Sequence, residues 1–290
     1  MILKRLSECR LDEAVQTWNR AFGDFASQQL FTSETLLLKI RQEGLSPSMS
    51  VMAFDQNAPA GILLCGKRTA NGKVRGWNGG TGVVPEARGK RIGRMMLARS
   101  MEHYREEGVE IATLEVSAEN EAAIKLYESA GYRLKEVLGI FHQRGRLPFL
   151  ALPYSAAIQQ ISVERLLLIP FYNHDSPWQT QPENIINPSA ILLSSQTGQE
   201  LGYALFKRIF SSDRTLLEIQ LYQCNVHPEA PMPKLLAAYL LDAVFQPQLN
   251  ISRSAVNVGK SSIDVVEHLH SAGFDCWLQQ LELMWEIEKQ

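Results

Sequence analysis

The feature of this sequence that most constrains the fold is an internal duplication. Three features recur in the same order. A hairpin-like segment lies at 50–68 and again at 190–208, a Pro-Glu-Ala triplet at 85–87 and 228–230, and a Ser-Ala-Gly-aromatic quartet at 129–132 and 271–274. The equivalent positions, with Gly61 matched to Gly202 in the hairpins, lie 141 to 143 residues apart, a spacing too regular for chance. A repeat of that length is a whole domain. Because Gly145, Pro148 and Pro153 interrupt the chain near its middle, the sequence predicts two domains, residues 1–146 and 147–290.

The residue pattern of the first copy predicts an α/β (α+β) fold. The expected elements, in order, are a strand at 2–6, helices at 11–22 and 33–41, a hairpin at 50–68, a glycine-rich extended segment at 74–84, a helix at 92–107, a strand at 111–116, a helix at 120–130 and a closing strand from 132. Such an order indicates a mixed sheet flanked by helices.

Composition excludes several classes of function. With 45% apolar residues, 21% charged residues and a net charge of −2, and with its largest basic cluster confined to Arg88–Arg94, the chain is not expected to bind nucleic acid. The four cysteines are widely separated, so neither disulfides nor a metal site are expected. Residues 1–15 do not resemble a signal peptide and no run is long enough to span a membrane. We therefore expect a cytoplasmic protein without membrane or metal partners.

A glycine-containing turn between an extended segment and a helix is the first candidate binding site. It runs through Arg88, Gly89, Lys90 and Arg91 into a helix whose apolar stripe begins at Ile92. The first turn of a helix presents unpaired N–H groups, and the helix dipole favours negative charge there. The turn therefore predicts a diphosphate site, although a solvated basic turn that starts an ordinary helix is an equally good interpretation of this segment alone.

This turn resembles the signature of the GNAT superfamily, the N-acyltransferases that use acetyl-CoA. Arg88 and Gly93 match the ends of that signature, whereas Arg91 replaces its central glycine, which is tolerable only if residue 91 keeps a right-handed backbone. A second family signature is matched at 114–116 and at Asn120, Ala123, Leu126, Tyr127 and Gly131. The resemblance covers residues 1–143 and, more weakly, the remainder, which implies a tandem GNAT fold in which each copy has a mixed, mostly antiparallel twisted sheet.

The resemblance implies acetyl-CoA as the acyl donor. The strand before the loop would separate from its neighbour at Gly79, Gly80 and Gly82 and offer its backbone to the pantetheine arm. The residues implied in binding CoA are Val83, Val84, Arg88, Gly89, Lys90, Arg91, Ile92, Gly93, Arg94, Asn120, Ala123 and Tyr127.

The resemblance also implies the catalytic groups. Tyr127 matches the acid that protonates the departing thiolate, and its alternative role is a core aromatic residue of its helix. Glu115 is the best candidate for the base, although it could equally be a solvated strand residue. Asp24 is a weaker candidate.

The second copy lacks these features. Its loop contains Pro228, Pro231 and Pro233 and no glycine, and prolines have no N–H to offer a phosphate. Leu269 stands at the tyrosine position, and His268 and His270 point in different directions on a helix. The second copy is therefore expected to be catalytically degenerate, supporting the first copy or shaping the acceptor pocket together with residues 18–38.

Three functions remain open at this stage. The leading hypothesis is an N-acetyltransferase acting on a primary amine of a small molecule, a peptide or a protein, as a monomer or weak homodimer. The first alternative is a non-catalytic acyl-CoA sensor. The second is an aminoacyl or thiol-building tandem relative that uses another acyl donor.

Overall fold

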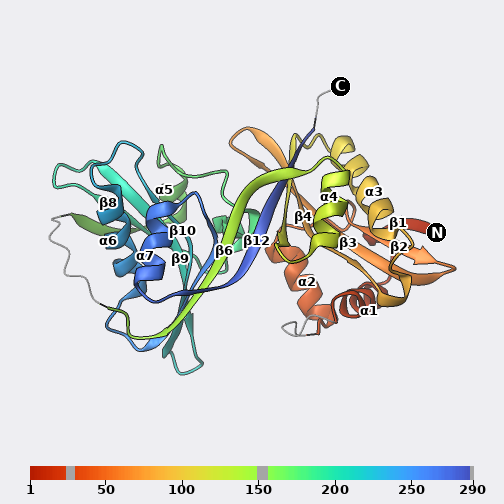
Figure 1. The fold of residues 1–290 in the computed structure, drawn as a ribbon, viewed down its shortest axis with the longest axis horizontal. Helices are drawn as coiled ribbons and strands as arrows, with labels where there is room; N and C mark the ends of the chain where they lie inside the picture. The colour runs from red at the N-terminus through yellow and green to blue at the C-terminus, as the bar shows by residue number, and fades with distance from the viewer. Residues whose placement is uncertain (24–29, 149–155, 288–290) are drawn as a thin grey trace. The chain divides into compact units, whose positions relative to one another are not determined.

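The structure, a computed structural model, describes residues 1–23, 30–148 and 156–287. The chain forms two compact units (Figure 1): unit 1 comprises Met1–Lys135 and Leu281–Gln290, and unit 2 comprises Glu136–Gln280. The C-terminal strand therefore contributes its last residues to the unit in which the chain begins. Asp24 lies outside the described residues.

Unit 1 contains the elements expected for the first copy. They are β1 (Ile2–Arg5), α1 (Leu11–Phe22), α2 (Ser33–Gln42), β2 (Val51–Asp55), β3 (Ala58–Ala70), β4 (Lys73–Val83), α3 (Ile92–Glu106), β5 (Ile111–Ser117) and α4 (Glu121–Ser129). Two long strands are divided between the units, β6 (Arg133–Gly145) at residue 135 and β12 (Asp275–Glu286) at residue 281. The helices and strands predicted from the sequence are confirmed, with ends that differ by at most two residues.

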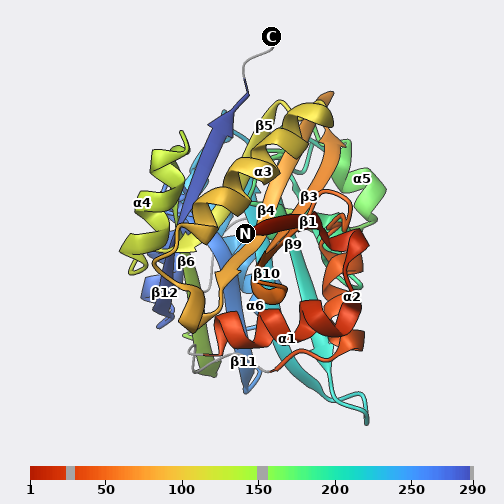
Figure 2. The ribbon, with the colours of Figure 1, turned by 90° about the vertical axis from the view of Figure 1, so that its right-hand side faces the viewer.

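The sheet of unit 1 has the strand order β1-β2-β3-β4-β5-β12. The first four strands are paired antiparallel, and β4 pairs with β5 in parallel, so the expected mixed and mostly antiparallel sheet is confirmed. In Figure 1, α1 and α2 lie below these strands and α3 and α4 above them. Figure 2 shows α3, in yellow, lying across the sheet.

Amphipathic stripes attach the helices of unit 1 to its sheet. In α1, Ala14, Trp18 and Ala21 are buried, which is the three-to-four residue spacing of one helix face. In α3 the predicted stripe, from Ile92 to Tyr104, is buried in one core cluster with Leu63 and Cys65 of β3. These contacts orient the N-terminal end of α3, where the basic loop joins it.

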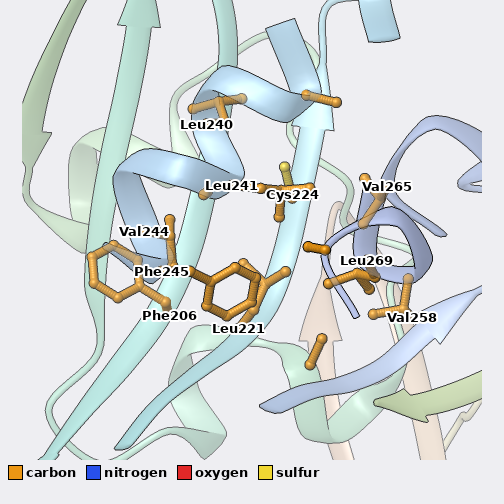
Figure 3. Packing of buried hydrophobic residues seen from close by; sticks show 14 of the residues in the cluster. Phe206, Leu221, Cys224, Leu240, Leu241, Val244, Phe245, Val258, Val265 and Leu269 are labelled. Carbon is orange, nitrogen blue, oxygen red and sulfur yellow. The ribbon is translucent and has the colours of Figure 1, made fainter. Parts of the chain in front are cut away.

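Unit 2 has a corresponding arrangement of strands, but one short α-helix, α5 (Val163–Leu167), stands where unit 1 has α1 and α2. Its other elements are β7 (Ala157–Ile161), β8 (Ser189–Ser194), β9 (Glu200–Phe210), β10 (Leu216–Val226), α6 (Pro233–Phe245), β11 (Ile251–Gly259) and α7 (Ile263–Ser271). Their order is β7-β8-β9-β10-β11-β6, with one parallel pair, β10 and β11. Figure 3 shows the apolar core between α6, α7 and this sheet. None of the described helices is long and apolar enough to cross a membrane.

Candidate active site

Strands β4 and β5 separate part-way along their length. Their parallel register stops at Asn78 and Leu114, although β4 continues to Val83 and β5 to Ser117. On the other side, β4 stays paired with β3 as far as Val83. The backbone of β4 beyond Asn78 therefore has no recorded pairing with β5, and such a strand edge can pair with an extended ligand.

A bulge at Gly79 accompanies the separation. The register of β3 with β4 shifts between Leu64 and Cys65, whose partners are Gly80 and Asn78. Gly80 has φ +149°, and a Cβ there would lie 2.6 Å from Cη2 of Trp18. A Cβ at Gly82 would lie 2.7 Å from the side chains of Ala21 and Phe22. Glycine is required at Gly80 and Gly82 because α1 packs directly on the strand backbone, whereas a Cβ at Gly79 would meet Trp77 and Leu45.

The loop after β4 leads into the first turn of α3. A 3-10 turn at Pro85–Ala87 is followed by Gly89, which has φ +78°. The first α-helical bond runs from the Met95 N–H to the Arg91 carbonyl, which leaves the amides of Ile92, Gly93 and Arg94 without an intrahelical acceptor. This is the geometry of an anion cradle.

The backbone of Arg91 corrects one prediction. The sequence required a right-handed conformation at this position, but Arg91 has φ 61° and ψ 19°, the left-handed region. A residue with a Cβ is disfavoured there by about 1–2 kcal/mol. A glycine would adopt this conformation without that cost, so Arg91 introduces backbone strain at the start of α3.

A cavity of about 710 Å³ lies against this loop. It is bounded by the end of α1, the free part of β4, the basic loop and the start of α4, through Ala21, Phe22, Thr81, Gly82, Val83, Ala87, Arg88, Gly89, Arg91, Ile92, Gly93, Arg94, Asn120, Ala122, Ala123 and Leu126. The structure thus brings nine of the twelve residues implied in CoA binding to one cavity. The other three, Val84, Lys90 and Tyr127, do not line it.

Two of the predicted cations have local partners. Arg88 donates from Nε to the Val83 carbonyl and from Nη2 to the Ala21 carbonyl, each at 3.2 Å, so it braces the loop against β4 and α1. Lys90 pairs with Asp55 at 2.9 Å, at the β2–β3 turn. Arg91 and Arg94 are exposed and line the cavity, so they are the cations best placed to meet an anion there.

Val84 and Asn120 have structural contacts. Val84 is buried and its N–H donates to the Ala60 carbonyl. Asn120 is the N-cap of α4, where its Oδ1 accepts from the Ala123 N–H at 3.1 Å. Asn120 therefore sets the start of the helix that forms the far wall of the cavity.

Tyr127 is the buried residue of α4. It is 6% exposed and belongs to the apolar cluster of unit 1. Burial raises the pKa of its phenol, while hydrogen bonds with Thr81 and Asn78 act to lower that pKa. Asn78 in turn donates to Thr81 Oγ1 at 2.9 Å and accepts from the Gly80 N–H. The side chains of Asn78 and Thr81 had no motif to reveal them in the sequence, apart from being polar residues within a buried strand.

Glu115 projects from the face of β5 opposite to that of the buried Leu114 and Val116. Its Oε2 accepts from Trp77 Nε1 at 2.7 Å, and its Oε1 is buried with no hydrogen-bond partner among the described residues. Burial raises the pKa of this carboxyl to about 7, and the negative charge of Glu282 acts in the same direction. The interpretation of Glu115 as a solvated residue is therefore wrong. Trp77 was not identified from the sequence, because 38 positions separate it from Glu115.

Comparison with known proteins identifies the domain that contains this cavity. The sequence model of the acetyltransferase (GNAT) family matches residues 11–132. These residues form a GNAT acetyltransferase domain. A mycothiol acetyltransferase of Propionibacterium freudenreichii subsp. shermanii is 32% identical over 126 residues, 42% of this chain. The match spans 39% of that relative's length.

Solved structures extend the likeness to both units. A GCN5-related N-acetyltransferase from Sphaerobacter thermophilus aligns with 99% of this chain and 96% of its own, with 13% identity and a TM-score of 0.64. A tandem GNAT protein from the clavulanic acid biosynthesis pathway aligns with 100% and 98%, with 15% identity and a TM-score of 0.55. The two units therefore have the tandem GNAT fold.

The second GNAT-like unit repeats one backbone feature of the loop. Met232, the N-cap of α6, has φ 55°, the conformation of Arg91. An adjacent cavity of about 730 Å³ is lined by Met232, Pro233, Lys234, Leu235, Ala238, Glu267, His268, His270 and Ser271. Lys234 is paired with Glu267 at 2.6 Å, and Leu269 is fully buried in the core (Figure 3).

His268 of unit 2 lies 3.4 Å from Asp242. The pair joins two helices, α7 and α6. Across residues 1–23, 30–148 and 156–287, no group of three or more His, Cys, Asp or Glu side chains is placed to hold a metal ion.

Proposed function

We propose that the chain transfers an acetyl group from acetyl-CoA to a primary amine of a small molecule, peptide or protein, by direct attack of the amine on the thioester. The separation of β4 from β5 beside a cavity that ends on helix amides carries this proposal. The separated edge suits the pantetheine arm, and the amides of Ile92, Gly93 and Arg94 suit the diphosphate.

The proposal assigns the chemistry to side chains on two faces of the sheet. Tyr127 protonates the departing thiolate, and Thr81 and Asn78 orient its hydroxyl. Glu115 accepts the proton of the amine, directly or through water. A pKa of about 7 for Glu115 supports this role, because a base is most effective when its pKa is near the working pH.

In this proposal some residues of the site contact the phosphates and others support the site. Arg91 and Arg94 pair with phosphate oxygens. Arg88, Val84 and Asn120 hold the loop, strand and helix in position. Lys90 contributes only by tying the loop to Asp55.

The catalytic domain in this proposal comprises residues 1–146, completed by the end of β12. Residues 147–290 form the degenerate copy. Pro231 and Pro233 remove two amides from its loop, and Leu269 offers no proton. We expect this copy to bind no CoA through its loop.

Two measurements on the purified chain test the proposal. Calorimetric titration with CoA should show one saturable site, which Arg94→Glu weakens at least tenfold by reversing a charge at the cavity; Arg99→Glu, on the exposed side of the same helix, is the matched control. Thiol release from acetyl-CoA should then depend on an added amine. Binding of CoA without thiol release across a broad amine panel would favour an acyl-CoA sensor, and absence of CoA binding would overturn the proposal.

A further inference from the structure

A cation already lies between two tryptophans on the α1 and α2 side of unit 1. The Lys39 ammonium is 5.7 Å from the ring centre of Trp18 and 6.0 Å from that of Trp77, within the reach of about 6 Å for a cation–π contact. Lys39 also pairs with Glu43, and both side chains are at most one fifth exposed. This position therefore favours a positive charge that is largely removed from water.

The aromatic pair connects the cavity with Glu115. Trp18 packs on Phe22 with ring centres 4.3 Å apart, and Phe22 lines the cavity. Trp18 also covers the distorted part of β4 at Gly80. On the other side, Trp77 donates its indole N–H to Glu115. Trp18 thus links the Lys39 ammonium to the wall of the cavity, and Trp77 links it to Glu115.

Two buried polar atoms of this cluster have no hydrogen-bond partner among the described residues. They are Nε1 of Trp18, a donor, and Oε1 of Glu115, an acceptor. Buried polar atoms are nearly always paired, and exceptions call for a ligand, water or strain as the explanation. An ammonium group could donate a hydrogen bond to Oε1 of Glu115, and a neutral oxygen could accept one from the indole N–H of Trp18.

We propose that the acyl acceptor is a cationic primary amine with an oxygen close to its nitrogen, bound beside Trp18 and Trp77 where the Lys39 ammonium now lies. This inference rests on the proposed function. Lys39 is an internal stand-in that the acceptor displaces. The other charged groups around Glu115 are Glu43, Glu282 and Lys135.

The proposed step balances as follows for an acceptor RNH₃⁺. One proton passes to Glu115, the nitrogen lone pair forms the C–N bond, and the C–S bond breaks. The thiolate takes a proton from Tyr127, which regains one from the acylated nitrogen. The products are the amide, CoA and a protonated Glu115.

Tryptophan fluorescence without any CoA tests this inference separately from acyl transfer. The probes are butylamine, which is protonated at neutral pH, and its near-isosteres 1-butanol and 2-methoxyethylamine. Butylamine should quench saturably and bind at least tenfold more tightly than 1-butanol. Replacing Lys39 by Met or Gln should tighten butylamine binding at least fivefold, because the competing ammonium is gone, whereas Lys39→Arg should not.

The oxygen is tested by the third probe. 2-Methoxyethylamine should bind at least threefold more tightly than butylamine, and Trp18→Phe should remove that difference. Equal affinities for butylamine and 1-butanol would overturn the inference. So would an unchanged butylamine affinity in both Lys39→Met and Lys39→Gln, provided that calorimetry shows that both variants still bind CoA. Loss of CoA binding in the unmodified chain would instead overturn the proposed function.

Discussion

Trp77 and Glu115 are joined across strands β4 and β5 by a hydrogen bond of 2.7 Å from the indole nitrogen to Oε2. The bond orients a carboxyl group whose second oxygen, Oε1, is buried and has no hydrogen-bond partner among the described residues. Burial raises the pKa of this carboxyl to about 7, which makes it a candidate for proton transfer.

The rate of acyl transfer should depend on pH through Glu115. Because its pKa is raised to about 7, the carboxyl group is protonated below that pH, and kcat/KM should rise as the pH passes through about 7 and then level off. Glu115→Gln should lower kcat at least 100-fold and abolish this inflection. A pH–rate profile with saturating acetyl-CoA provides the measurement, and an unchanged inflection in the variant would assign the titration to another group.

The same shift has an opposite consequence for stability. A folded-state pKa raised above the unfolded value of 4.5 means that the folded chain holds the proton more tightly, so the stability contributed by this proton is present below pH 4.5 and is lost as pH rises through 7. The loss amounts to about 3 kcal/mol. In urea unfolding, the free energy of unfolding of Glu115→Gln should therefore rise relative to that of the unmodified chain between pH 4.5 and 8. A constant difference between the two across this range would contradict the raised pKa.

Tyr127→Phe should separate catalysis from binding. The variant loses only the hydroxyl of a buried side chain, so kcat should fall at least 100-fold while the CoA dissociation constant changes less than twofold. Tyr132→Phe is the matched control, because Tyr132 is also buried in this cluster but its hydroxyl has no hydrogen-bond partner among the described residues. Equal effects of the two substitutions would remove Tyr127 from the reaction.

Arg91→Gly and Met232→Gly should have the same effect on stability and different effects on binding. Both residues adopt left-handed conformations at helix N-termini, so glycine should relieve strain in each case and raise the free energy of unfolding by about 1 kcal/mol or less. Only Arg91→Gly should weaken CoA binding, because it removes a cation from the cavity. Calorimetry and urea unfolding measure the two effects, and equal CoA affinities for both variants would show that Arg91 makes no contact with the diphosphate.

Gly82→Ala should damage both fold and site. The added methyl group would lie 2.7 Å from Ala21 and Phe22, so α1 must move away from β4 at a cost of about 1–3 kcal/mol. Gly93→Ala is the milder comparison, because its nearest contact is the flexible side chain of Leu126 at 3.2 Å. Thermal unfolding of the two variants should rank Gly82→Ala as the less stable, and the reverse order would show that α1 yields more easily than its packing indicates.

Local pattern was sufficient to predict the elements of the first unit. The stripe from Ile92 to Tyr104 and the extended segment that became β4 can be recognised because side-chain periodicity is a property of neighbouring residues. The position of Arg88 in the loop could be predicted for the same reason. Its hydrogen bonds with the Val83 and Ala21 carbonyls could not, since they depend on how α1 packs against the strand.

The sequence by itself was enough to recognise the duplication and to predict an anion-binding loop in one copy and its loss in the other, because these properties belong to short segments and their spacing. Only the tertiary structure decided which side chains meet. Sheet pairing brings Trp77 to Glu115, and the packing of α2 beside α1 places Lys39 over Trp18. The conformation of Arg91 was decided by the packing of strand and helix on either side, which is strong enough to hold a residue in a backbone region that its own side chain disfavours.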